Sequence, residues 1–203
     1  MDDLSRPEAE FVEAYKELAA VNRWLGGIRA VERFLPHSNR PVRILDVAAG
    51  GCDVGEALMK DTKCDVVSLD LNLRGLKFAV RSTPVAGDAL QLPFPDGSFD
   101  AVISSLFFHH LSSSECIRVL SEMWRTTRRL VVVNDLHRHP IAHVSIRILS
   151  ALLSKSTMFR NDSAASVRRA FKPAELMEIS RQAQVPARVI RSFPYRLVLV
   201  AVK

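Results

Sequence analysis

The pattern of apolar and polar positions in this chain changes its period repeatedly along its length. Short apolar, β-branched runs with the length of a buried strand occupy residues 42–47, 63–71, 84–89, 99–104 and 129–134. Between these runs, apolar residues recur at helical spacing over 53–60, 72–81 and 112–124. Strands that alternate with helices predict an α/β fold with a parallel sheet, right-handed crossovers and helices on both faces.

The N-terminal end departs from this alternation. Ser5 and Glu8 have the spacing of a capping box, and apolar residues at helical spacing over 11–25 predict a helix. Gly26-Gly27 predicts a break before a second helix. We therefore expect residues 1–38 to form a helical cap.

At the C-terminal end, residues 175–184 predict the last helix, although Lys172 stands where a Ser or Thr cap would be expected. Residues 188–193 and 196–202 then alternate like an antiparallel hairpin. At this length we expect a single domain over 1–203.

The connection over 136–172 is long for such a fold, and long connections are often functional. Its centre, Pro140–Leu153, is nearly apolar around its circumference and too short to span a bilayer. We expect an insertion that acts as a lid over the substrate. A structural helix that fills a gap in the core is the competing interpretation.

The candidate chemistry begins at the first strand. After that strand, small residues run from Ala48 to Gly51, and a helix follows, so the backbone can approach a nucleotide closely. Asp70 ends the second strand, twenty residues after Gly50, where a carboxylate can accept hydrogen bonds from both hydroxyls of a ribose. A nicotinamide dinucleotide is the rival ligand, but Cys52 replaces the glycine that lets the backbone meet a pyrophosphate.

With the stretch GDALQLPFPDGSFDAVISSLFFHHL at 87–111, the chain resembles the class I S-adenosylmethionine (SAM)-dependent methyltransferases from Arg43 to about Asp135. The resemblance implies a Rossmann-like, seven-stranded, mostly parallel sheet with a C-terminal antiparallel hairpin. It also implies SAM as the cofactor and a small-molecule substrate. The family's first turn reads D-x-G-x-G-x-G, and this chain has Asp46, Ala48, Gly50 and Cys52 in those places.

The resemblance and the carboxyl ends of the strands together suggest the site residues. Candidates for the cofactor site are Asp46, Ala48, Gly50, Asp70, Leu71, Asp88, Ala89, Ser105 and Arg23. Candidates for the substrate site are Trp24, Phe108, His139 and Arg160. Arg23 and Trp24 enter because Asn22–Gly26 looks like the corresponding segment of quinone-methylating members.

A hydroxyl acceptor needs a base, and His109, His110 and His137 are the catalytic candidates. Adjacent side chains of an extended segment point to opposite sides, so we expect at most one of His109 and His110 to act.

Charge and cysteine content narrow the class of protein. Residues 1–117 carry 12 Lys/Arg and 17 Asp/Glu, whereas residues 118–203 carry 16 and 5. This asymmetry is compatible with an acidic substrate, an anionic membrane surface or nucleic acid. The basic residues are scattered without an aromatic ladder, which argues against nucleic acid. The three cysteines lack metal-ligand spacing, so no metal is expected.

The resulting hypothesis is a cytoplasmic SAM-dependent methyltransferase without stable membrane insertion. Its acceptor would be small and largely apolar, methylated at a phenolic or enolic oxygen. C-methylation of a quinone precursor is the alternative, and a cofactor-binding partner protein without turnover is a second one. The sequence leaves the oligomeric state open.

Overall fold

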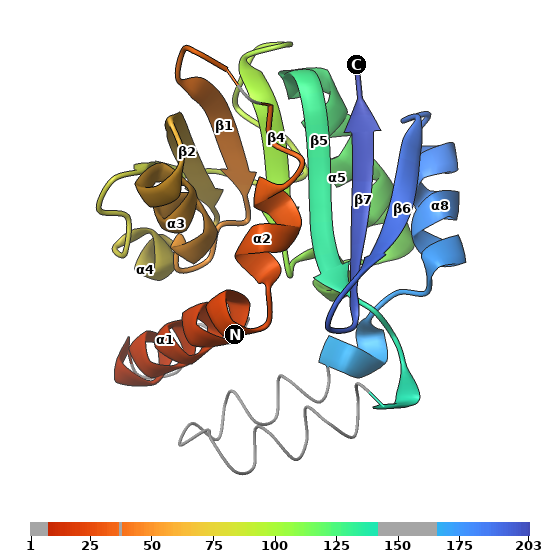
Figure 1. Ribbon diagram of the computed structural model, residues 1–203, viewed down its shortest axis with the longest axis horizontal. Coiled ribbons are helices and arrows are strands. Elements are labelled where there is room, and N and C mark those ends of the chain that lie inside the picture. Colours follow the sequence, from red (N-terminus) through yellow and green to blue (C-terminus); the bar gives the residue numbers. More distant parts are fainter. Residues whose placement is uncertain (1–7, 37, 142–165) are drawn as a thin grey trace.

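A seven-stranded sheet forms the centre of the molecule in the computed structural model, which describes residues 8–36, 38–141 and 166–203. The strand order is β3-β2-β1-β4-β5-β7-β6 (Figure 1). The strands are β1 (Val42–Val47), β2 (Cys64–Asp70), β3 (Thr83–Ala86), β4 (Phe99–Ser105), β5 (Thr127–Leu136), β6 (Ala187–Ser192) and β7 (Arg196–Val202). The strands β1 to β5 are parallel to one another, and β7 pairs antiparallel with both β5 and β6. The predicted Rossmann-like sheet with a C-terminal hairpin is confirmed.

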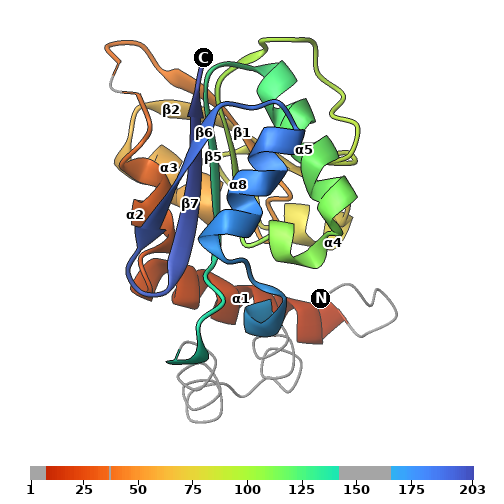
Figure 2. The same ribbon diagram turned by 90° about the vertical axis from the view of Figure 1, so that its right-hand side faces the viewer.

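Helices cover both faces of the sheet, as Figure 2 shows. On one face, α2 (Gly27–Glu32) and α3 (Asp53–Asp61) pack on a buried apolar cluster; α5 (Ser113–Thr126) and α8 (Pro173–Gln182) pack on another cluster on the opposite face. Alternate residues of one strand supply the two clusters: Val131 and Val133 face α5, whereas Leu130 and Val132 face α2. The near-continuous apolar strands of the sequence follow from this burial on both faces.

The helix α1 (Glu8–Trp24) lies across the carboxyl ends of the strands rather than on a face of the sheet (Figures 1 and 2). It ends as the sequence predicts, because Gly26 has a φ of 69° in the left-handed region that glycine adopts readily. The segment that contains Ser5 lies outside the described residues, so the predicted capping box there stays a prediction.

The helix predicted over residues 72–81 is wrong in length. Only α4 (Leu73–Leu76) forms, and the chain then turns. The carboxylate of Glu56 on α3 accepts the backbone N–H groups of Val80, Arg81 and Ser82 at 2.8–2.9 Å. These N–H groups are therefore satisfied by a side chain from another element instead of by a continuing helix.

The first turns of α5 and α8 are capped in different ways. Ser112 caps α5 in a complete capping box with Glu115. Lys172 precedes α8 without a side-chain cap, because an ammonium group cannot accept a hydrogen bond. The carboxylate of Glu175 instead accepts the Lys172 N–H at 2.8 Å and so satisfies the start of that helix.

The two ends of the long connection after β5 lie side by side. His137 and Phe171 form a parallel bridge, and Arg138 N–H donates to the Phe171 carbonyl at 2.8 Å. The central part of this connection, 142–165, lies outside the described residues, so the lid remains a prediction. Within the described ranges, we find no helix with the length and apolar character that a membrane span requires.

Candidate functional site

The turn after β1 has left-handed backbone at every second residue. Ala48, Gly50 and Cys52 have φ values of 56°, 53° and 60°. These are the positions at which the resembled family places glycine, which adopts this conformation without a Cβ clash. Ala48 and Cys52 therefore take the same backbone path at a cost in strain.

Two other elements lie directly on this turn. A Cβ added to Gly75 of α4 would come within 2.0 Å of the Gly50 carbonyl oxygen, so α4 can approach only with a glycine there. On α1, the Tyr15 side chain packs on Gly51, where an added Cβ would lie 3.2 Å from the ring. Tyr15 entered the sequence analysis only as part of the apolar pattern of its helix, because nothing local shows that this helix crosses the turn.

The acids predicted for the nucleoside lie at the ends of the next two strands. Asp70 is half-buried, and its two carboxylate oxygens accept the Gly50 N–H at 2.8 Å and the Asn72 N–H at 2.7 Å. Asp88 is exposed and accepts the Leu90 N–H at 2.8 Å. A carboxylate has about four lone-pair directions, so both acids keep acceptor capacity for a ligand.

Between these acids, the apolar side chain of Leu71 is 76% exposed, whereas Ala89 is buried. The structure thus brings four of the predicted cofactor residues to adjacent strand ends, with an uncovered apolar side chain among them.

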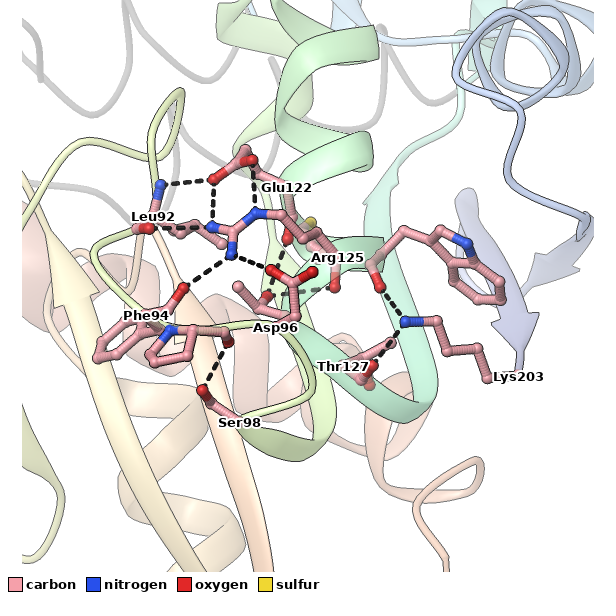
Figure 3. Close-up of polar contacts among 12 residues, drawn as sticks. Leu92, Phe94, Asp96, Ser98, Glu122, Arg125, Thr127 and Lys203 are labelled. Atoms are coloured by element: carbon pink, nitrogen blue, oxygen red, sulfur yellow. Dashed lines mark hydrogen bonds and ion pairs between the residues drawn. The ribbon is translucent and has the colours of Figure 1, made fainter.

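Arg125 fixes the loop that carries Asp88. Its guanidinium donates to the Leu92 and Phe94 carbonyls and to the carboxylates of Asp96 and Glu122, at 2.8–3.1 Å (Figure 3). These contacts use the five N–H donors of the side chain. The loop after β3 is therefore held to α5 without forming a helix of its own, and the sequence analysis did not identify Arg125.

Asp46 lies buried below the turn. Burial, and then the negative charge of Asp53, raise the pKa of the Asp46 carboxyl well above its usual value. Its Oδ2 atom has no hydrogen-bond partner among the described residues. Asp46 is therefore a buried carboxyl beneath the turn with a raised pKa and an unpartnered oxygen, and its role in the cofactor site stays a prediction.

His109 and Asp135 form a buried pair where β4 and β5 end. The His109 Nδ1 atom lies 2.7 Å from Asp135 Oδ1, and the His109 backbone N–H donates to Asp135 Oδ2 at 3.1 Å. Burial alone would raise the pKa of Asp135, but His109 and two backbone N–H groups outweigh it and hold this pKa below its usual value. An ionised carboxylate only accepts hydrogen bonds, so Nδ1 is the donor in this pair and Nε2 is the ring nitrogen that the pair leaves open to a ligand.

The other candidate histidines have different surroundings. His109 and His110 lie in a short 3-10 helix, η1 (Phe108–His110), so the extended backbone assumed from the sequence is wrong there. Their rings are 4.2 Å apart, and His109 is buried while His110 is exposed. His137 is half-buried; burial, followed by the charge of Arg191, lowers its pKa. The His139 ring stacks on the Tyr195 ring at 5.1 Å.

A buried arginine connects three elements at the same edge of the sheet. Arg196 on β7 is 2% exposed; its Nε donates to the Leu25 carbonyl and its Nη2 to Asn22 Oδ1, both at 3.1 Å. Asn22 Nδ2 donates in turn to Asp53 Oδ2 at 3.0 Å, at the start of α3. Burial lowers the pKa of Arg196 to about 10.

This network changes the interpretation of the Asn22–Gly26 segment. The buried polar residue is Asn22, whereas the predicted cofactor residue Arg23 and the predicted substrate residue Trp24 are both exposed, Trp24 by 85%. The sequence analysis missed Arg196, since its partners are more than 170 positions away along the chain.

Three predicted site residues remain to be placed: Ser105, Phe108 and Arg160. Ser105 Oγ accepts from Asn134 Nδ2 at 2.7 Å, on the face that carries α2. Phe108 is fully buried in the core cluster beside α5, so in this structure its side chain has no exposed surface to offer a substrate. Arg160 lies outside the described residues.

Comparisons with known proteins relate this chain to methyltransferases. Residues 45–132, which include the turn, both nucleoside acids and His109, match the family model described as a methyltransferase domain. A SAM-dependent methyltransferase of Aquifex aeolicus has a TM-score of 0.68, with 97% of this chain and 98% of that chain covered. The two sequences are 15% identical, so this likeness shows the fold alone.

Curated relatives are similar over the central part of the chain. A demethylmenaquinone methyltransferase of Renibacterium salmoninarum is 37% identical over 128 residues, which cover 57% of this chain and 53% of the relative. A ubiquinone/menaquinone biosynthesis C-methyltransferase of Methylobacterium nodulans is 36% identical over 101 residues, with 44% and 39% covered. The chain spans about half the length of the curated relatives it matches. Residues 45–132 are therefore a methyltransferase domain of the class I SAM-dependent type, which the relatives and the fold also indicate.

The described residues fit SAM, the cofactor of this class. Asp70 and Asp88 offer acceptors for the nucleoside, Leu71 offers an apolar surface, and the left-handed turn over Ala48–Cys52 presents backbone instead of bulky side chains. Among the described residues, no group of three or more His, Cys, Asp and Glu side chains could hold a metal ion.

Proposed function

We propose that this protein transfers a methyl group from SAM to a ring carbon of a small, largely apolar quinol, the reduced form of a quinone precursor. The observation that carries the proposal is the buried His109–Asp135 pair at the ends of β4 and β5, next to the strands of the cofactor turn. The name of one relative, a ubiquinone/menaquinone biosynthesis C-methyltransferase, supports carbon as the acceptor atom, and the name of another, a demethylmenaquinone methyltransferase, supports a quinone precursor as the acceptor.

His109 acts as the base. A quinol carbon becomes nucleophilic when the neighbouring hydroxyl loses its proton, and a positioned base contributes about 10²–10⁴-fold to such a step. The hydroxyl proton moves to Nε2 of His109, and the ionised Asp135 stabilises the imidazolium through the Nδ1–H hydrogen bond. Once the ring carbon has taken the methyl group and the bond from methyl to sulfur has broken, the hydrogen on that carbon leaves as a proton and His109 returns its proton to the oxygen, which restores the aromatic quinol. The burial of His109 limits this base to acceptors that enter the protein.

The cofactor supplies an electrophilic methyl group on a positively charged sulfur. Asp70, Asp88 and the turn at Gly50 hold its nucleoside end, so they position the methyl without taking part in proton transfer.

Product analysis tests the proposal. The protein is incubated with ¹³C-methyl SAM and a short-chain demethylmenaquinol, and the product is examined by carbon NMR. We expect a methyl carbon bonded to a ring carbon, and turnover that His109→Gln lowers by about 10²–10⁴-fold.

A methyl bonded to oxygen would replace C-methylation with the O-methylation that the sequence first suggested. Absence of product from any quinol or phenol, with SAM binding intact in calorimetry, would support a cofactor-binding partner protein instead.

A further inference from the structure

Two aromatic side chains on neighbouring segments at the carboxyl edge of the sheet are almost fully exposed. Trp24, at the end of α1, is 85% exposed, and Phe193, in the turn between β6 and β7, is 91% exposed. Their segments meet: a Cβ added to Gly26 would lie 3.4 Å from the Phe193 carbonyl oxygen, and the Leu25 carbonyl accepts from Arg196. Figure 2 shows the end of α1 beside this turn.

Ile141 extends the apolar part of this surface. It is 56% exposed, and its N–H donates to His139 Nδ1 at 3.3 Å. The His139 ring stacks on Tyr195, which lies in the same turn as Phe193. We call Trp24, Phe193 and Ile141, with their neighbours Arg23 and Arg191, the Trp24–Phe193 surface.

Other exposed apolar residues differ in kind. Val80 and Val202 are 82% and 63% exposed, but each is a single aliphatic side chain in a separate part of the fold. Among the large apolar side chains exposed in the described ranges, Trp24 and Phe193 are the aromatic ones. Single exposed apolar residues are ordinary, whereas a cluster marks an interaction site.

The charge of the segments that form this surface has one sign. Residues 22–29, 137–141 and 191–196 contain five arginines and neither Asp nor Glu. Arg23, Arg29 and Arg191 are exposed. Arg196 is buried, and Arg138 pairs with Glu175. The segments that carry the two exposed rings therefore also carry three exposed arginines and no Asp or Glu.

We infer that the Trp24–Phe193 surface docks the protein on an anionic lipid bilayer. Indole and phenyl rings bury favourably at the boundary between headgroups and acyl chains, and guanidinium groups pair with anionic headgroups. Two exposed rings on neighbouring segments, without a ladder for successive bases, fit a lipid boundary better than a nucleic acid strand. Docking places the carboxyl edge of the sheet, which holds the cofactor residues, at the membrane. This inference goes beyond the proposed function and stands without it.

Fluorescence tests the docking directly, because the chain has two tryptophans. In Trp124→Phe, Trp24 is the single reporter. With vesicles of phosphatidylcholine and phosphatidylglycerol, we expect a blue shift of its emission and protection from iodide quenching. Vesicles of phosphatidylcholine alone should give neither change, and added salt should reverse binding because it screens the exposed arginines.

Sedimentation with the same vesicles measures which side chains carry the binding. The double variant Trp24→Ala/Phe193→Ala should lower vesicle partitioning by about tenfold or more. Arg23→Gln/Arg191→Gln should lower it by a similar factor on anionic vesicles. Val80→Ala and Lys60→Gln, at exposed positions outside this surface, are the matched controls and should leave it unchanged.

Three results would overturn the inference: no binding by the unaltered protein, equal binding to neutral and anionic vesicles, or binding that the surface variants do not change. Binding to duplex DNA that is sensitive to the arginine variants, without vesicle binding, would assign the surface to nucleic acid. Circular dichroism melts of every variant confirm that a loss of binding is not a loss of fold.

Discussion

The carboxyl edge of the sheet has two halves that are built differently. The nucleoside half, at the ends of β1, β2 and β3, presents accessible acids held by backbone N–H groups within about twenty positions in sequence, as for Asp70 and Gly50. The transfer half, at the ends of β4, β5 and β7, contains buried polar side chains bound to one another across longer separations. His109 and Asp135 are 26 positions apart, and Asn22 and Arg196 are 174 apart. The first half is organised to accept a ligand from solvent, and the second to hold charge away from solvent.

Two buried carboxyl groups, Asp46 and Asp135, also differ in their partners and in the direction of their pKa shifts. Asp46 has neighbouring acids and an unpartnered oxygen, and its pKa is raised because burial and the charge of Asp53 both disfavour its ionised form. Asp135 is equally buried, but His109 and backbone N–H groups keep its pKa low. Burial alone therefore does not decide whether an acid is charged; its partners do.

The largest expected effect is on Asp135. Asp135→Asn removes the charge that orients and stabilises His109, so turnover should fall by about 10²–10⁴-fold while SAM affinity stays the same. Steady-state kinetics with calorimetry of SAM binding measures the two separately. An equal loss of both would contradict the division of the edge into two halves.

Asp70→Ala should give the opposite result. Loss of the carboxylate removes acceptors for a ribose and releases two backbone N–H groups, so SAM affinity should weaken by about 1.5–3 kcal/mol. Turnover at saturating SAM should change little. Calorimetry measures the affinity, with Asp65→Ala, at an exposed position of β2, as the matched control.

Asp46→Asn should alter the pH dependence of stability. A carboxyl with a raised folded pKa binds more protons in the folded state, so wild-type stability falls as pH rises from about 4 toward that folded pKa. The asparagine side chain does not ionise, so the stability of the Asp46→Asn variant does not fall with pH for this reason. Its free energy of unfolding, relative to wild type, should rise between about pH 4 and neutral pH.

Urea unfolding at several pH values measures this difference. Asp135 has the opposite effect on the pH dependence of stability. The stability that comes from its lowered pKa is present above about pH 4 and is lost as pH falls through the folded pKa. A difference between Asp46→Asn and wild type that does not vary with pH would contradict the raised pKa.

The smallest expected effect is on the cofactor turn. Ala48→Gly should raise the free energy of unfolding by about 0.5–1 kcal/mol, because the relief of left-handed strain exceeds the entropy cost of glycine. Ala49→Gly is the matched control: its φ is not in the left-handed region, so it should destabilise the fold by about 0.5–1 kcal/mol. Equal effects of the two variants would show that the strain at Ala48 is negligible. Thermal melts of both variants give the comparison.

The nucleoside half was predictable because its signals are local. The strand, the small-residue turn and the acid at Asp70 stand at fixed spacings, and the backbone geometry of one βαβ unit brings them together. The positions of the seven strands followed from hydrophobic period for the same reason. The predicted length of the helix over 72–81 was wrong because a side chain from another element decides it: Glu56 of α3 accepts the N–H groups that a longer α4 would have used.

The sequence by itself determined the class of protein, the strands and the candidate acids of the cofactor site. Only the tertiary structure decided which histidine pairs with Asp135, that α1 crosses the cofactor turn through Tyr15, and that Arg196 is buried against Asn22. The physical reason is that strand and turn preferences act over a few residues and leave a pattern in the chain. Partners of a buried charge are chosen by the packing of elements far apart in sequence, and that choice leaves no period or spacing to find.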